Sequence, residues 1–317
     1  MQTNFLYFCR KTTTHLTSYI QEQAHKLGFD ACGFAKAAPL PKNEVEKIAK
    51  WLQANRNGEM SYMARNFEKR IDPTKLVEGC KSVIVVALNY YPTKNLDLGT
   101  LKVARFAHGQ DYHQIIRGKL SNLLAQIQAS GVNVKGRGFS DSAPIAERYW
   151  AVQAGLGWIG KNQMVILPGM GSYFFLGVLF VDLELDYGTP SPNRCGKCNR
   201  CQMACPTKAL DHQGLDARKC LSYLTIEKSG HFNVEEAAHM NKKGWIFGCD
   251  ICQEVCPWNR YSKPHQNKEL KPSEAFLNLS ISDFNNLTID QFNQLFSNTC
   301  LERTGFEGIK RNLEASK

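Results

Sequence analysis

Apolar side chains recur every three or four residues in several segments, which is the spacing of an amphipathic helix. The pattern predicts helices over residues 14–27, 43–54 and 113–129, and another that begins near Pro144 and ends before Gly155. Asn43 and Glu46 have the spacing of a capping box at the start of the second helix. Near the C-terminus, Thr288 and Gln291 have the same spacing and predict one more short helix.

Continuous apolar runs bounded by turn residues predict buried strands. These runs cover residues 82–88, 163–167 and 172–181. Helices and strands alternate to about residue 185, so we expect an α+β fold with an α/β domain at its N-terminus. The most apolar segment, residues 173–181, is too short to cross a bilayer, and we expect no contact with a membrane.

A chain of 317 residues is long enough for about two domains. Residues 188–193 contain two prolines and have the composition of a linker. We expect an α/β domain over residues 1–187, a cysteine-rich domain over residues 188–262, and a short helical tail over residues 263–317.

Eight of the twelve cysteines lie between positions 195 and 256. One run reads Cys195-x2-Cys198-x2-Cys201-x3-Cys205-Pro206, and a later one reads Cys249-x2-Cys252-x3-Cys256-Pro257. Cysteines at two-residue gaps followed by Cys-Pro are typical of bacterial ferredoxins with 4Fe–4S clusters, in which the last cysteine of each run ligates the other cluster. The chain therefore predicts a ferredoxin-like pair of 4Fe–4S clusters, which pass single electrons.

The same rule assigns each cysteine to a cluster. One cluster takes Cys195, Cys198, Cys201 and Cys256, and the other takes Cys205, Cys249 and Cys252. The second set lacks one thiolate, because Ile246 stands where the usual pattern has a cysteine. Cys220 is the only nearby spare cysteine, and we expect it to complete the set.

Cysteines can also bind structural zinc or form disulfides. A structural zinc site usually has two separated C-x2-C pairs, which fits three cysteines in seven residues poorly. A disulfide framework needs an oxidising compartment, and residues 1–11 contain neither a secretory leader nor a twin-arginine leader. We therefore expect a cytoplasmic protein. The remaining cysteines are expected to be buried, inert thiols: Cys9, Cys32, Cys80 and Cys300.

The net charge of +10 favours an anionic partner, of which a nucleic acid is the obvious large example. The basic residues form several small groups along the chain, and any one of these groups also fits an ordinary solvated surface. The charge therefore supports RNA binding without demonstrating it.

Asp141 and Ser142 precede the predicted helix near Pro144. The simplest interpretation is that one of them caps this helix. A carboxyl group at this place could also donate a proton if burial raised its pKa. The residues alone favour the cap.

Gly155, Gly157 and Gly160 match the G-x-G-x-x-G pattern of dinucleotide-binding proteins. That pattern must follow a strand and begin a helix, whereas here the glycines follow a helix and precede a strand. We therefore reject a dinucleotide site and expect close backbone approach, either to another segment or to a planar ligand. Asp111 and His113 form part of a cobalamin-type Asp-x-His motif, but His113 also fits the first turn of a helix.

Taken together, these segments resemble epoxyqueuosine reductases. The resemblance rests on Arg105-Phe106-Ala107, Asp111-Tyr112-His113, Asp141-Ser142-Ala143-Pro144, residues 157–162, residues 171–177, residues 220–227, Arg303-Thr304-Gly305 and Arg311-Asn312. It covers roughly residues 14–313. The cysteine runs alone are unspecific, but their combination with residues 157–162 and 220–227 is characteristic of that family.

The resemblance implies an N-terminal cobalamin-binding domain related to that of reductive dehalogenases, followed by the ferredoxin module. Some members carry a further helical-repeat domain, which we do not expect here. The implied reaction removes the epoxide oxygen of epoxyqueuosine at the tRNA wobble position, giving queuosine and water. It uses cob(I)alamin that receives its electrons from the two clusters.

Asp141 matches the proton donor proposed for the family, which reverses the preference for a helix cap. The resemblance also suggests residues that line the corrin ring or its tail, and Asp141 belongs with them. The others are Arg65, His113, Trp158, Lys161, Asn162, Ser172, Ser222 and Tyr223. An external donor of the flavodoxin or ferredoxin type is expected, and the protein is expected to act as a monomer.

Two alternatives are a corrinoid iron–sulfur reductive dehalogenase and a ferredoxin-type electron carrier. The positive charge suits tRNA better than a small neutral organohalide. A simple carrier would not need the 185 or so residues that precede the cysteine runs.

Overall fold

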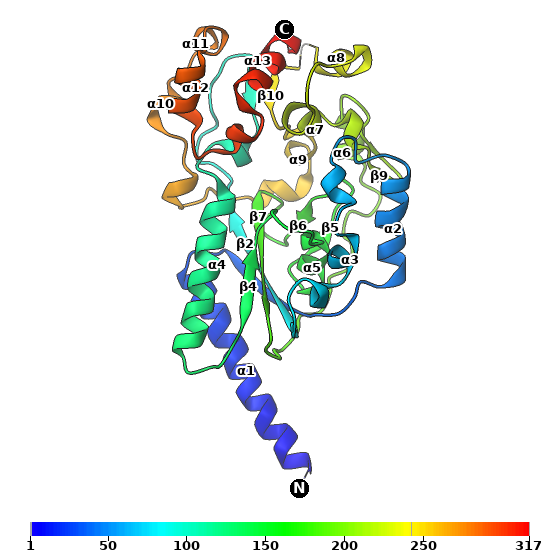
Figure 1. Ribbon diagram of the computed structural model, residues 1–317, viewed down its shortest axis with the longest axis vertical. Helices are drawn as coiled ribbons and strands as arrows, with labels where there is room; N and C mark the ends of the chain where they lie inside the picture. The colour runs from blue at the N-terminus through cyan, green and yellow to red at the C-terminus, as the bar shows by residue number, and fades with distance from the viewer. Residues whose placement is uncertain (1, 242, 317) are drawn as a thin grey trace.

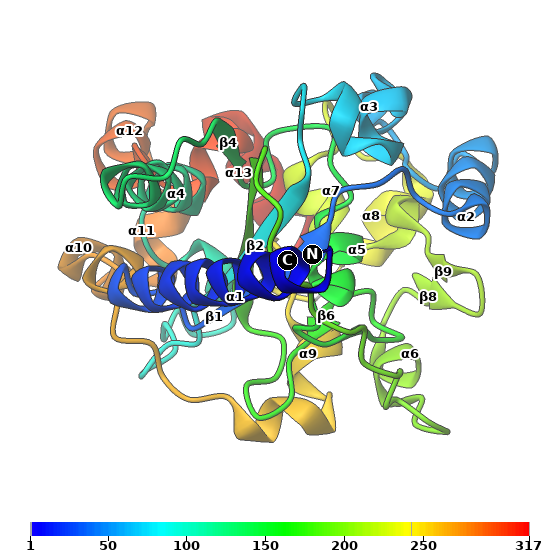
Figure 2. The same ribbon diagram turned by 90° about the horizontal axis from the view of Figure 1, so that it is seen from below.

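The computed structural model describes residues 2–241 and 243–316, with side chains described from residue 13 onward. Its centre is a four-stranded antiparallel sheet with the strand order β1-β2-β7-β4. The strands are β1 (Ala31–Lys36), β2 (Ser82–Asn89), β7 (Phe174–Val181) and β4 (Gly136–Phe139). Helices lie on both faces of this sheet, and a second, mostly helical layer covers one end of it (Figures 1 and 2).

Both faces of β2 are buried, because its side chains alternate between two cores. Ile84, Val86 and Leu88 pack with α1 (Gln2–Lys26) and α4 (Tyr112–Ala129). Val83, Val85 and Ala87 pack with α5 (Glu147–Gln153) on the other face. This double burial explains why β2 reads as a continuous apolar run in the sequence.

Helix α4 lies unusually close to the sheet because two strand glycines lack side chains. A Cβ on Gly177 of β7 would lie 2.6 Å from Cγ2 of Ile116, and one on Gly138 of β4 would lie 2.8 Å from Cβ of Leu120. The N-terminal turn of α4 is thereby held against the end of β7, where ring centroids of Tyr112 and Phe175 stack 4.0 Å apart.

The cysteine-rich segment is built from short elements. They are α6 (Arg200–Ala204), β8 (Leu210–Asp211), β9 (Gly214–Leu215), η4 (Ala217–Lys219), α7 (Leu221–Ile226), α8 (Val234–Met240), β10 (Trp245–Phe247), α9 (Ile251–Glu254) and η5 (Pro257–Tyr261). Strand β10 pairs in parallel with β3 (Lys102–Val103) from the N-terminal half. The segment is therefore joined to the rest of the fold by main-chain hydrogen bonds.

The last fifty residues form short helices. They are η6 (Lys268–Leu270), α10 (Glu274–Leu277), α11 (Ile281–Asn285), α12 (Ile289–Phe296), η7 (Cys300–Arg303) and α13 (Gly305–Ala315). Phe284, Phe296 and Leu301 are buried in the same core as α4. The tail thus packs on the N-terminal half, and the domain boundaries at residues 187 and 262 stay predictions.

The remaining elements connect these parts and carry loops of the candidate site. They are α2 (Lys42–Gln53), η1 (Ser61–Met63), α3 (Phe67–Ile71), η2 (Pro73–Lys75), η3 (Arg105–Ala107), β5 (Trp158–Ile159) and β6 (Val165–Ile166). No helix in the described ranges is both long and apolar enough to cross a membrane.

Several predictions of local structure are confirmed. The α+β class is correct, and the capping box of Thr288 and Gln291 is present at α12. His113 lies in the first turn of α4. Gly155 and Gly157 connect α5 to β5, Gly160 follows β5, and a Cβ on Gly157 would lie 2.0 Å from the Ile166 carbonyl oxygen. This glycine therefore serves the close approach of another strand.

Other local predictions are wrong. Helix α2 begins at Lys42 after Pro41, so Asn43 does not cap it. Helix α5 begins at Glu147, and Ala146 at its N-cap makes no side-chain capping bond, so neither Asp141 nor Ser142 caps it. Residues 163–167 form only the two-residue strand β6. Strands β1 and β4 were not predicted, because glycine and polar residues interrupt their apolar pattern.

Candidate functional site: a thiol cluster and an acidic corner

Helices α6 and α9 pack against each other and bring the cysteines of both runs together. Cys201 lies on α6, Cys205 ends it, Cys252 lies on α9, and Cys256 begins η5. Cys220 is the N-cap residue of α7, and Cys249 follows β10. Cysteines far apart in sequence therefore come together where these two short helices meet.

The electrostatic neighbours of the thiols fall into two groups. Burial raises the pKa of Cys201, and the thiols of Cys256, Cys195 and Cys198 raise it further. Burial likewise raises the pKa of Cys249, and the thiols of Cys220 and Cys205 raise it further. Cys252 has a pKa raised by burial and by Cys220, Cys249, Cys201 and Cys205, so it lies where the groups meet. The spacing groups the thiols in the same way, and their assignment to two clusters stays a prediction.

All eight of these cysteines are free thiols and none forms a disulfide. Cys32, Cys80 and Cys300 are also free and buried, as predicted, whereas the Cys9 side chain lies outside the described residues. Burial raises the pKa of Cys32 to about 12, so this thiol stays protonated and inert.

Lys161 and Asn162 lie on the turn between β5 and β6, directly beside the thiols. The Lys161 ammonium group donates to the carbonyl oxygens of Gly196 and Cys198, both at 2.9 Å. The Asn162 amide donates to the Cys252 carbonyl oxygen at 3.4 Å. Each side chain thus fixes the main chain of one cysteine loop.

Trp158 and Ser172 are buried at the junction of the sheet and the cysteine segment. The Trp158 ring meets Trp258 edge-on with centroids 4.8 Å apart, and its Nε1 is buried without a hydrogen-bond partner among the described residues. The Ser172 hydroxyl donates to Gln253 at 2.9 Å, and its backbone N–H donates to Asn259 at 2.6 Å. Ser172 therefore joins β7 to η5.

Ser222 and Tyr223 follow Cys220 on α7. The Tyr223 hydroxyl accepts the Glu59 backbone N–H at 2.7 Å, which ties α7 to the loop before η1. Ser222 is half-buried beside it, and Arg65 is exposed on the loop between η1 and α3.

Asp141 lies two residues beyond β4 in a left-handed backbone conformation, with φ of 48°. Its side chain is 70% exposed. The Tyr112 hydroxyl donates to Asp141 Oδ2 at 2.8 Å, and the Asp141 backbone N–H donates to Glu147 Oε1 at 2.7 Å. The carboxylate is thus accessible while its loop is held from both sides.

Charged and aromatic groups surround this carboxylate, and the sequence did not single out two of them, Tyr62 and Glu147. Burial and the nearby Asp141 charge raise the pKa of Glu147 above its ordinary range. Burial, Glu227 and Asp141 raise the pKa of Tyr62 to about 12, and Arg303 lies over the Tyr62 ring. We call the set Asp111, Tyr112, His113, Asp141 and Glu147 the acidic corner.

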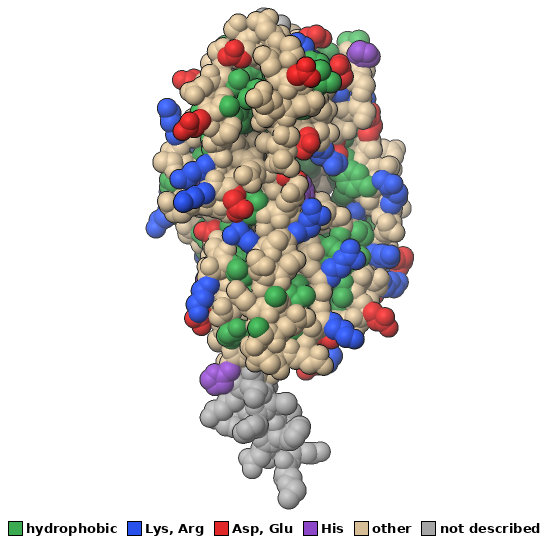
Figure 3. All heavy atoms as spheres, turned by 60° about the vertical axis from the view of Figure 1, so that its left-hand side comes forward, with side chains coloured by type: hydrophobic (Ala, Val, Ile, Leu, Met, Phe, Trp, Pro, Cys, Tyr) green, Lys and Arg blue, Asp and Glu red, His purple; other side chains and the backbone are tan. Residues whose placement is uncertain are grey.

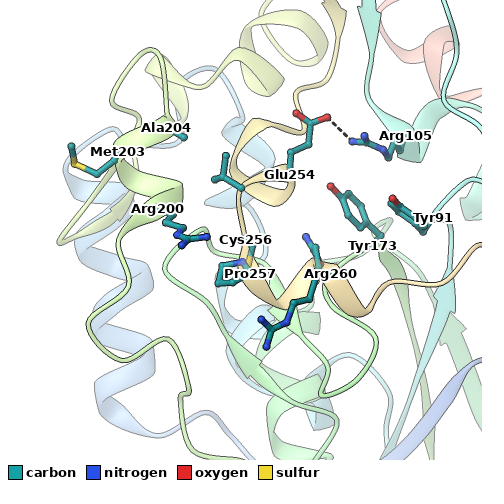
Figure 4. Close-up of a pocket in the computed structure, with 12 residues that line it drawn as sticks. Tyr91, Arg105, Tyr173, Arg200, Met203, Ala204, Glu254, Cys256, Pro257 and Arg260 are labelled. Atoms are coloured by element: carbon teal, nitrogen blue, oxygen red, sulfur yellow. Dashed lines mark hydrogen bonds and ion pairs between the residues drawn. The ribbon is translucent and has the colours of Figure 1, made fainter.

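A surface pocket of about 980 Å³ lies beside Cys256 (Figure 4). Tyr91, Tyr173, Arg200, Met203 and Cys256 line it together with Arg105, Arg260 and Glu254. Figure 4 shows Arg105 reaching toward Glu254, to which it donates at 2.8 Å. Arg105 also pairs with the buried Asp250 at 3.1 Å. The pocket gives solvent an approach to the cluster loop at Cys256.

Two family descriptions match the chain. Residues 194–259 match the "4Fe-4S double cluster binding domain". This match favours iron–sulfur clusters over the zinc and disulfide alternatives. Residues 70–142 match "Epoxyqueuosine reductase QueG, DUF1730".

Full-length relatives agree with these matches. An epoxyqueuosine reductase from Cyclobacterium marinum is 47% identical over 95% of this chain and 96% of its own length. One from Pseudomonas aeruginosa is 38% identical over 94% of this chain and 84% of its own length.

Solved structures of the same enzyme have a similar fold. A structure of epoxyqueuosine reductase with an epoxyqueuosine-modified tRNA-Tyr stem loop has a TM-score of 0.84 at 26% identity, over 95% of this chain and 80% of that one. The Bacillus subtilis enzyme, solved with an aspartate catalytic loop swung out of its active site, has a TM-score of 0.85 at 25% identity, over 95% and 81%. This chain belongs to the epoxyqueuosine reductase family of oxidoreductases.

Proposed function

We propose that this protein reduces epoxyqueuosine to queuosine at the wobble position of tRNA. The observation that carries the proposal is the combination, in one chain, of a two-cluster thiol module with an accessible carboxylate held by its neighbours. The first delivers single electrons, and the second can protonate an oxygen that leaves a strained ring. Full-length likeness to epoxyqueuosine reductases supports the same reaction.

The proposed ligands follow the two thiol groups. Cys195, Cys198, Cys201 and Cys256 would hold one cluster, and Cys205, Cys220, Cys249 and Cys252 the other. Eight free thiols are the number that two cubane clusters need. Lys161 and Asn162 would support the clusters by holding the loops that carry these ligands.

Cobalamin, when bound, would supply a nucleophilic cobalt centre for the opening of the epoxide. The unpartnered Trp158 Nε1 fits this cofactor, because the corrin ring carries amide groups that accept hydrogen bonds. Arg65, His113, Asp141, Ser222 and Tyr223 remain candidates for the same pocket. Lys161, Asn162 and Ser172 are already engaged with protein partners, so their role would be to position the pocket.

Asp141 would donate a proton to the epoxide oxygen as the ring opens. Its carboxylate is exposed on one side and bound to the Tyr112 hydroxyl on the other, so the substrate can reach it without distorting the loop. A positioned acid of this kind typically contributes about 10²–10⁴-fold to the rate.

The tRNA would approach over the face that bears α4 and the C-terminal helices. Lys and Arg side chains are spread across that face (Figure 3). Tyr62 is 37% exposed and Arg303 lies over its ring, 5.9 Å from the centroid. An exposed aromatic ring beside a cation is suited to stacking an unpaired base, as single-stranded RNA loops require.

An external donor of the flavodoxin or ferredoxin type would supply electrons at the first cluster. Four cations and no acidic residue lie between positions 187 and 210: Arg194, Lys197, Arg200 and Lys208. All four are exposed around the first cysteine loop, as is Met203 on α6. Figures 1 and 2 both show α6 on the opposite side of the molecule from α4 and β4, so an acidic donor and tRNA could bind together. We further propose a cytoplasmic monomer.

Anaerobic reconstitution tests the proposal directly. The purified chain, loaded with iron, sulfide and cobalamin, should convert epoxyqueuosine to queuosine in a tRNA stem loop when a low-potential reductant is added. A protein that retains corrinoid and iron but leaves the stem loop unchanged would contradict the function, and one that retains no corrinoid would favour a simple electron carrier.

A further inference from the structure

The His113 ring lies between two carboxylates in the acidic corner. Its Nδ1 is 2.6 Å from Oδ1 of Asp111, and its Nε2 is 3.9 Å from Oδ2 of Asp141. Stacking on Tyr112, with ring centroids 4.0 Å apart, fixes the plane of the imidazole. Asp111 is itself fixed as the N-cap residue of α4, where it accepts the His113 backbone N–H at 3.0 Å.

These contacts assign the ring nitrogens. Although burial raises it, the pKa of the Asp111 carboxyl lies below its ordinary value because of its bonds to His113. An ionised carboxylate only accepts hydrogen bonds, so Nδ1 of His113 carries a proton in this contact. Nε2 is then the nitrogen that faces Asp141, in the arrangement by which an aspartate orients a histidine toward a reacting group.

The proposed reaction consumes more protons than Asp141 can supply. An epoxide that becomes a carbon–carbon double bond loses both C–O bonds and releases its oxygen as water. Two electrons, which come from the external donor through the clusters, and two protons are required for each turnover. Asp141 holds one proton, so a second must reach the same place before the oxygen leaves as water.

We propose that His113, oriented by Asp111, delivers the second proton through Asp141. The histidine gives the Nε2 proton to the Asp141 carboxylate after its first transfer, and regains a proton from solvent. Asp111 lies at the edge of a surface pocket of about 390 Å³, lined also by Gln114 and Lys119, which brings water to this side of the pair. The proposal rests on the proposed function and gives His113 a role in proton supply, distinct from a contact with the corrin.

Other groups near the relay differ from His113 in their geometry. Tyr112 also touches Asp141, but burial and the Asp141 charge raise its pKa well above its ordinary value, so it holds its proton. Glu147 meets the Asp141 main chain and not its carboxylate. The charged or titratable groups that also face the corner are Tyr62 of η1, Arg70 of α3, Arg117 of α4, Arg148 of α5, and Cys300 and Arg303 of η7. No ion pair or hydrogen bond joins any of these groups to Asp141 Oδ2 in the described part of the chain, whereas His113 Nε2 lies 3.9 Å from it.

The test measures queuosine formation against pH in the reconstituted enzyme with a modified stem loop. His113→Gln keeps a polar side chain and removes the exchangeable proton, and Asp111→Asn removes the orienting charge. We expect about 10–100-fold lower activity in each, loss of the high-pH decline that marks deprotonation of an imidazolium, and recovery of His113→Gln by added imidazole. His231→Gln, an exposed histidine on the loop before α8, is the matched control and should behave as the unaltered protein.

The outcomes separate the relay from the proposed function. If the unaltered protein makes no queuosine, the proposed function fails. If it does, and His113→Gln keeps either the rate or the original pH profile, the relay is wrong. Iron and corrinoid content, measured for every variant, identify any protein that has lost activity by losing cofactors. If His113→Gln loses its cofactors, the activity of Asp111→Asn decides whether the relay is right.

Discussion

The cysteine module and the acidic corner are assembled in opposite ways. In the module, the residue types and their spacing predict the chemistry, and the fold brings the cysteines together by packing α6 against α9. In the corner, ordinary residues acquire a function from their contacts: a tyrosine, a histidine and a glutamate hold one aspartate. Loss of a ligand should therefore abolish function in the first region, whereas the second should show graded losses.

The largest effect is expected from Cys220→Ala, because Cys220 is the proposed ligand that lies outside the two cysteine runs. The variant should retain about four of eight irons per chain and lose queuosine formation, since the second cluster then lacks a thiolate. Iron and sulfide analysis after anaerobic purification is the measurement. Cys32→Ala, which removes a buried free thiol elsewhere, is the control and should keep all the iron. Full iron content in Cys220→Ala would mean that another residue completes the cluster.

In the acidic corner, Asp141→Asn should have the strongest effect. The amide keeps the shape and can still meet the Tyr112 hydroxyl, but it has no proton to donate. Turnover should fall about 10²–10⁴-fold while iron and corrinoid content stay unchanged. Single-turnover queuosine formation measures this loss. Near-normal turnover would remove Asp141 from the chemistry and leave it as a loop residue.

Tyr112→Phe tests how much activity depends on the hydrogen bond that holds the Asp141 side chain. Phenylalanine keeps the stack on Phe175 and His113 and removes only the hydroxyl that donates to Asp141. We expect roughly a tenfold loss in kcat with KM little changed, which is about the value of one charge-assisted hydrogen bond. A loss as large as that of Asp141→Asn would instead identify Tyr112 as a proton donor itself.

The sequence predicts the cysteine module better than the acidic corner, because the module depends on residue spacing and the corner depends on tertiary contacts. The spacing alone groups the thiols, and even Cys220 follows by elimination, because a cubane needs four thiolates. The catalytic reading of Asp141 needed the resemblance, since its local pattern favours a helix cap, and α5 in fact begins six residues later. Glu147 lies in no motif, and Tyr112 enters only through the resemblance of Asp111-Tyr112-His113 to the family. They meet Asp141 only because α4, β4 and α5 pack together, and such contacts have no local signal in the chain.

Charge reversal at the first cluster tests the module from outside. Arg200→Glu combined with Lys197→Glu should slow cluster reduction by an acidic ferredoxin several-fold at low salt, and the difference should shrink as salt screens the charges. Stopped-flow absorbance of the clusters gives the rate. Reduction by dithionite should be unaffected. Lys310→Glu combined with Arg117→Glu is the control, because the exposed Arg117 and the half-buried Lys310 lie on elements remote from α6 (Figure 1). An equal loss of tRNA affinity in the α6 variant would mean that RNA, and not the donor, uses this surface.

The smallest effect concerns the packing of α4 on the sheet, which positions the acidic corner, and not the chemistry of the corner. A Cβ on Gly177 would lie 2.6 Å from Ile116, so Gly177→Ala should push α4 off the sheet and destabilise the fold by about 1–3 kcal/mol. Gly118 lies on α4 itself with no atom within 4 Å of the added Cβ, and Gly118→Ala should stabilise the helix by about 0.5–1 kcal/mol. Thermal unfolding of the two variants measures these changes in opposite directions. Because α4 carries Tyr112 and His113, only Gly177→Ala should also lower queuosine formation; equal activity in both variants would show that the corner tolerates movement of its helix.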